Sequence, residues 1–160
     1  METLTQEDLD YIENVIKTGC NQELENLAKD LLNTFSDIDD RIKLSEQRFG
    51  RMYVRSITVP ANMLLLGKPR ITSNSWICIY GEMITRKSNE DQATETKTGH
   101  TAAGLDEPGT WRIAVTKTAC KWTTVHKMPE WVPIEKELDY ISGKLLRRTS
   151  AHTFNMDEVA

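Results

Sequence analysis

Paired cysteines and clustered histidines are both missing from this chain. Its three cysteines are odd in number and form no CxxC pair, which argues against a disulfide framework and against a structural zinc site. Its three histidines are widely scattered, with no ligand spacing. The sequence also has no GxSxG, P-loop, HExxH or dinucleotide-binding fingerprint. The unpaired cysteines predict reduced thiols in a cytosol. The missing fingerprints mean that the sequence offers no familiar catalytic motif.

Long hydrophobic runs and a surplus of positive charge are missing as well. The longest apolar runs, such as MLLL at 63–66, are far too short to cross a bilayer, and the N-terminus METLTQEDLD is acidic. We therefore expect neither secretion nor membrane contact. A net charge of -4 over 160 residues argues against general nucleic-acid binding. With 39% hydrophobic residues, the composition predicts one globular domain with room for a small appendage.

The first 49 residues show a helical period, which predicts a helical arm over 1–49. Apolar residues recur at helical spacing after TLTQED, and Gly19 is a plausible end of this first helix. A second helical pattern runs from Asn21 to about Arg48. Its apolar face either covers the domain's own core or pairs with a second copy, and the sequence leaves both open. The candidate interface residues are Leu24, Leu27, Leu31 and Phe35.

Residues 50–127 change to a period of two, which predicts an antiparallel β domain. The expected strands are MYVRSITVP, LLLGKPRI, SWICIYGEMITR, TWRIAVTK and KWTTVH. The polar stretch 87–99 is interpreted as a hairpin tip or mobile loop. The last zone, 128–160, predicts a short helix beginning near Pro133, followed by a flexible tail.

Three blocks in this β zone resemble a known family. VRSITVPANMLLLGK, EPGTWR and WTTVH occur in the order found in small cupin-like proteins of tailed bacteriophages, over about half of the chain. The resemblance implies a mainly β fold: a cupin-like antiparallel β-barrel or jelly roll, here with an N-terminal helical arm and a short C-terminal helix. It says little about activity, because a fold does not determine a function.

The same resemblance implies where a cupin metal would sit. In GKPRITSNSWICIYG, the positions of the two histidines and the carboxylate fall on Lys68, Arg70 and Asn74, and the fourth ligand position falls on Arg112. Lysine and arginine stay protonated near neutral pH and repel a divalent cation, and an amide replaces a carboxylate poorly. The sequence therefore predicts no catalytic transition metal and no cofactor.

Positive charge at the mouth of a barrel has to be compensated. Internal carboxylates such as Glu82, Asp106 or Glu107, bulk water, or a bound anion are the open alternatives. His126 fits a structural hydrogen-bonding role better than a site role. The candidate ligand-binding set, which includes a tryptophan for stacking on a ring, is Lys68, Arg70, Asn74, Trp111, Arg112 and His126.

Two classes of function remain open, with a third possibility beside them. The first is a non-enzymatic phage accessory protein of the host cytoplasm, for example a counter-defence factor, that forms a homo-oligomer and binds a host protein or a nucleotide-like anion. The second is a metal-independent cupin-type isomerase or hydrolase, with His126 or His100 as base and Arg112 steering an anion. A virion decoration protein is the third. The sequence favours the first, because no paired partner tunes the histidines.

Overall fold

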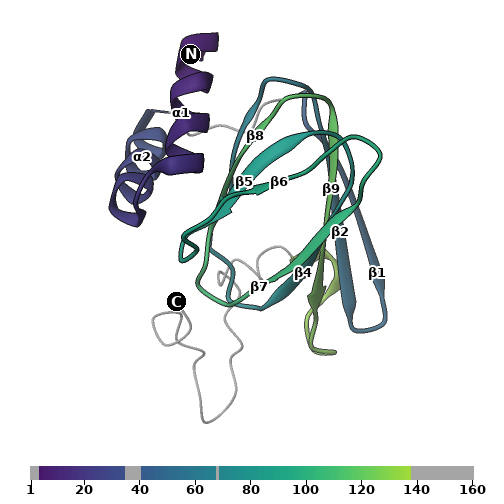
Figure 1. Ribbon diagram of the computed structural model, residues 1–160. Coiled ribbons are helices and arrows are strands. Elements are labelled where there is room, and N and C mark those ends of the chain that lie inside the picture. Colours follow the sequence, from purple (N-terminus) through teal and green to yellow (C-terminus); the bar gives the residue numbers. More distant parts are fainter. Residues whose placement is uncertain (1–3, 35–40, 68, 138–160) are drawn as a thin grey trace.

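Two helices lie against one side of a two-sheet β structure (Figure 1). The computed structural model describes residues 4–34, 41–67 and 69–137, to which every structural statement here refers. In chain order the elements are α1 Gln6–Thr18, α2 Asn21–Thr34, β1 Lys43–Phe49, β2 Met52–Val59, β3 Leu64–Gly67, β4 Asn74–Tyr80, β5 Met83–Lys87, β6 Thr94–Glu95, β7 Ala102–Asp106, β8 Arg112–Thr116, β9 Cys120–Lys127 and the 3-10 helix η1 Ile134–Lys136. No helix within these ranges is both long and apolar enough to cross a membrane.

The strand order is that of a jelly roll. One sheet has the order β1-β2-β9-β4-β7 and the other β3-β8-β5-β6, and the paired strands are antiparallel. The strands β2-β9-β4-β7 and β3-β8-β5-β6 form the two four-stranded sheets that two Greek keys produce, and β1 is added at the free edge of β2. The predicted mainly β fold is therefore confirmed. The described strands form two separate sheets rather than a closed barrel, so the barrel version of the prediction is not what the structure shows.

Helix α1 follows from local sequence signals. Thr5 and Asp8 form a reciprocal capping box, in which each side chain accepts a hydrogen bond from the other residue's backbone N–H. The apolar face of the helix is buried, and Gly19 caps its C-terminus. This helix and its end agree with the prediction.

The apolar stripe of α2 is used inside the chain. Leu24 and Leu31 are buried in one core cluster with Ile84 and Ile113, and Leu27 packs against it. Of the two alternatives that the sequence left open, the structure shows the intramolecular one for these three leucines. Phe35 lies outside the described residues.

The helical prediction is wrong beyond α2. Lys43–Phe49 is strand β1, paired with β2 from Lys43↔Thr58 to Phe49↔Met52. A two-residue loop joins the strands, and its first residue, Gly50, has a φ of 57°, as a type II′ hairpin turn needs. As a strand, residues 43–49 pair their backbone N–H and C=O groups with the edge of β2. A helix over the same residues could not make these bonds. Tertiary pairing therefore overrides a weak helical period.

Two smaller expectations meet different outcomes. The stretch 87–99, expected to be a hairpin tip or loop, contains the short strand β6. The helix expected after Pro133 begins as the 3-10 helix η1. Residues 138–160, over which the sequence predicts the remainder of a helix and a flexible tail, lie outside the described residues.

Arg86 joins the helices to the sheet. Its buried guanidinium donates hydrogen bonds to the carbonyls of Ile16 and Gly19 at the end of α1 and to Asn21 Oδ1 at the start of α2. We expect Arg86→Met to lower the free energy of unfolding by about 3 kcal/mol, because buried carbonyls lose charge-assisted partners. Urea denaturation measures this change. Arg51→Met, at an exposed ion pair with Glu130, is the control and should change stability by less than about 1 kcal/mol. Equal losses in the two variants would contradict the role given to Arg86.

Candidate functional site

The space between the two sheets is divided into an apolar end and a polar end. Cys78, Met83, Ala114 and Cys120 form a buried cluster at one end. Side chains alternate along a strand, so every second residue faces the space between the sheets. Toward the other end of the strands, these inward-facing residues are polar. The strand registers place Asn74 beside both Asp106 and His126 there. We call this region the polar end, and it contains most of the predicted site residues.

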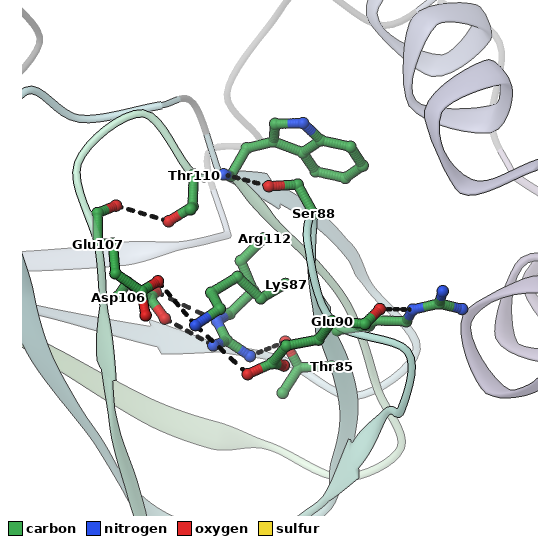
Figure 2. Close-up of polar contacts among 10 residues, drawn as sticks. Thr85, Lys87, Ser88, Glu90, Asp106, Glu107, Thr110 and Arg112 are labelled. Carbon is green, nitrogen blue, oxygen red and sulfur yellow. Dashed lines mark hydrogen bonds and ion pairs between the residues drawn. The ribbon is translucent and has the colours of Figure 1, made fainter. Parts of the chain in front are cut away.

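Arg112 is paired inside the protein. Its guanidinium contacts the two carboxylate oxygens of Asp106 at 2.6 and 3.3 Å, and it reaches Thr85 Oγ1 at 3.4 Å (Figure 2). The Arg112 and Asp106 side chains are only 11% and 14% exposed. A bidentate contact of this kind is among the stronger side-chain interactions. Asp106 is one of the carboxylates that the sequence offered as internal compensation.

Lys87 forms a second paired cation beside the first. Its ammonium lies 2.8 Å from Glu107 and 3.4 Å from Glu90, and Lys87 is directly opposite Arg112 in the β5–β8 register. The hydrogen bond with Glu107 raises the pKa of Lys87, and the same bond lowers the pKa of Glu107. Figure 2 shows both cations with their carboxylates. Sequence reasoning missed Lys87, although strand alternation places it on the same side as Thr85.

Two tryptophans, Trp76 and Trp122, are the aromatic partners of Arg112. Trp76 and Trp122 stack with ring centroids 4.4 Å apart, and the Arg112 guanidinium lies 4.9 Å from the Trp76 ring. A Cβ atom at Gly104 would lie 2.6–2.8 Å from Trp76, so only glycine fits beneath this ring. Trp111 instead packs against the core cluster of the helices. Trp111 therefore lies on the side of the sheet opposite the Arg112 guanidinium, because neighbouring residues of an extended chain point to opposite sides.

His126 is buried and neutral at physiological pH. Its Nδ1 lies 3.2 Å from Thr72 Oγ1, and its Nε2 lies 3.1 Å from Thr124 Oγ1. Its pKa is lowered to about 4, first by burial and then by the positive charges of Arg70 and Arg55. Both ring nitrogens therefore have hydroxyl partners, as a structural hydrogen-bonding role requires.

Arg70 and Asn74 complete the polar end. Burial lowers the pKa of Arg70, and the charge of Arg55 lowers it further. The Arg70 carbonyl accepts a hydrogen bond of 2.8 Å from the Gly109 backbone, which holds the β3–β4 loop against the β7–β8 turn. Asn74 is 8% exposed, and its Oδ1 has no hydrogen-bond partner. Lys68 lies outside the described residues.

The residues at the positions where the resemblance implies metal ligands do not suit a metal ion. The described members, Arg70, Asn74 and Arg112, carry two guanidinium groups and an amide, which provide no set of lone pairs for a divalent ion. Elsewhere in the described ranges, no group of three or more His, Cys, Asp or Glu side chains is arranged to hold a metal. We therefore derive no chemistry through a metal at these positions.

Comparison with known proteins yields structural similarity without sequence similarity. No protein-family model matches the chain. No curated protein matches it either. Similar solved structures include a cupin superfamily protein from Desulfitobacterium hafniense, with 8% identity, a TM-score of 0.46, and coverage of 62% of this chain and 88% of that one.

Two further similar structures come from other organisms. An RmlC-like cupin from Methanocaldococcus jannaschii is 13% identical over 66% of this chain and 92% of that one, with a TM-score of 0.45. The Cnp3 cupin domain of Schizosaccharomyces pombe is 11% identical over 66% of this chain and 72% of that one, also with a TM-score of 0.45. At such values the likeness carries no functional argument. The fold assignment rests on the strand order itself.

Proposed function

We propose that this chain is a non-enzymatic binding protein that holds the phosphate or carboxylate group of a small molecule at the polar end. The two guanidinium groups of Arg70 and Arg55, which lie close enough to affect buried His126, carry the proposal. The pKa values of Arg70 and His126 are lowered by burial and by neighbouring arginine charge. An anion placed there relieves this repulsion and accepts charge-assisted hydrogen bonds.

The arrangement of the polar end favours binding over catalysis. Both nitrogens of His126 are engaged by threonine hydroxyls, and the pKa of about 4 keeps the ring neutral. A general base works best with a pKa near the operating pH and with an orienting partner such as a carboxylate. Trp76, Trp122 and Arg112 pack together within the interior, so a small anionic group is expected to bind at the rim rather than deep between the sheets.

The biological setting remains an expectation from the sequence. A phage origin, a host partner, a counter-defence role and a location in the host cytoplasm all rest on the resemblance of the three sequence blocks. The enzyme and virion alternatives have no favouring observation in the site. Mass spectrometry of purified particles would test the virion alternative by copy number.

Thermal-shift measurements test the anion site. We expect inorganic phosphate, a nucleotide, a sugar phosphate or citrate to raise the melting temperature. A ligand at about 100 times its Kd contributes about 2.7 kcal/mol, or roughly 5–10 °C for a chain of this size. Arg70→Gln should abolish the shift, because it removes the charge that contacts the anion. Binding should weaken as salt increases.

Arg51→Gln is the matched control for this experiment. Arg51 is 62% exposed in an ion pair with Glu130, so its replacement removes the same charge from a surface position. It should keep the ligand-dependent shift. If none of the four anions stabilises the wild type, or if Arg70→Gln responds as the wild type does, the proposal fails.

A further inference from the structure

The outward side of the five-stranded sheet has an unusual composition. Strand alternation turns Tyr53 and His126 inward, so their neighbours along β2 and β9 point outward. The registers place ten outward residues in two rows across all five strands. The first row is Gln47, Val54, Val125, Ser75 and Leu105, and the second is Ser45, Ser56, Thr123, Ile77 and Ala103. We call these two rows the outer face.

The outer face contains no charged residue, although 28% of the chain is charged. Leu105 is 59% exposed at one side, and Phe49 and Met52, 55% and 50% exposed, extend the apolar surface past the first row. Five of the ten residues of the outer face are apolar, and contiguous exposed apolar surface marks interaction sites.

The described helices leave this face uncovered. Helix α1 contacts β5 and β8, which belong to the other sheet. Figure 1 shows both helices on the side of the molecule opposite β1, β2 and β9. The stripe of α2 that was a candidate for self-association is buried in the chain's own core. The outer face is therefore the better candidate for contact with a second copy.

We propose that two copies of this chain pack through their outer faces to form a symmetric homodimer. A two-fold interface brings a surface against itself, so it favours a face without like charges that would repel one another. Two twisted sheets pack in this way with their strands nearly aligned. Lys127 lies beyond the first row, and Lys43 and Lys121 lie beyond the second, so these three lysines supply a polar rim.

The outward side of the whole five-stranded sheet, which has the outer face at its centre, is large enough for a dimer interface. Five strands spaced by ~4.8 Å and about seven residues long at ~3.4 Å per residue cover roughly 600 Å² when flat. Side chains enlarge the accessible surface beyond this footprint. A standard interface buries about 800 Å² per partner, which this face can supply with its flanking residues.

Size-exclusion chromatography with light scattering on the full chain tests the proposal between about 1 and 100 µM. The wild type should have twice the 18.3 kDa mass of one chain. Val125→Lys, at the centre of the first row, should raise the dimer dissociation constant about 100-fold or more, because two like charges are then buried together. A circular-dichroism melt should show that this variant stays folded, since the new side chain points outward.

Leu32→Lys is the control, because Leu32 is a 51% exposed leucine on α2, away from the outer face. It should leave the dimer intact. A wild type that stays monomeric over the whole range overturns the proposal, as does a dimer that Leu32→Lys dissociates and Val125→Lys does not. The dimer does not depend on the anion site. Higher salt should not dissociate it, whereas salt should weaken anion binding.

Discussion

Replacing Asp106 with asparagine is expected to lower the free energy of unfolding by about 3 kcal/mol. The change leaves the buried guanidinium of Arg112 without its opposite charge while keeping nearly the same side-chain shape. Removing one partner of a buried ion pair generally costs about 3–5 kcal/mol. We place the effect at the lower end, because Trp76 and Trp122 still contact the guanidinium. Urea denaturation at neutral pH measures it.

A double-mutant cycle separates the ion pair from general damage. Arg112→Met combined with Asp106→Asn should cost less than the sum of the single changes, because neither buried charge is left alone. Glu130→Gln is the control, since its ion pair with Arg51 is exposed, and its effect should stay below about 1 kcal/mol. Strictly additive single effects would show that the pair is not the source of the loss.

Acidification is expected to destabilise the protein through His126 by about 3 kcal/mol. Its pKa is about 4 in the folded chain and 6.5 as the ordinary value. Because the pKa of His126 is lower in the folded chain, the unfolded chain binds the proton more tightly than the folded chain does. Stability is therefore unaffected by this residue above pH 6.5, falls as the pH drops below that value, and reaches the full loss below about pH 4. The magnitude follows from 1.36 kcal/mol per pKa unit.

Urea denaturation of the wild type and His126→Gln at pH 7.5, 5.5 and 4.5 checks this window. The variant starts from lower stability, because the histidine's hydrogen bonds are altered, but it should lose about 2.5 kcal/mol less than the wild type between pH 7.5 and 4.5. His100→Gln, at an exposed loop position, should follow the wild type. The same acid loss in the wild type and His126→Gln would rule out His126 as the sensor. A bound anion should reduce the loss, because its charge favours protonated His126.

Local signals in the sequence determined several features. The capping residues and apolar period of α1, and the alternating strands of the β zone, depend on neighbours in the chain and were confirmed. The sequence also identified basic and amide residues where the resemblance implies metal ligands, and it identified Asp106 and Glu107 among the carboxylates available for pairing. These conclusions needed residue types and spacings alone.

Other features depended on contacts between distant segments. The strand β1 forms because β2 offers an open edge, which no local period reveals. Which tryptophan meets Arg112 depends on Gly104, a neighbour of Trp76 only through the pairing of β4 with β7.

The sequence by itself therefore determined the elements with local signals and the chemical kind of residue at the polar end. Only the tertiary structure decided how charges and faces are paired. Arg112 meets Asp106, Lys87 meets Glu107, and His126 shares a corner with Arg70 and Arg55 because the jelly-roll strand order brings separate strands and loops together. Strand register sets which side of a sheet each residue faces, and register is fixed by pairing between strands rather than by either strand alone.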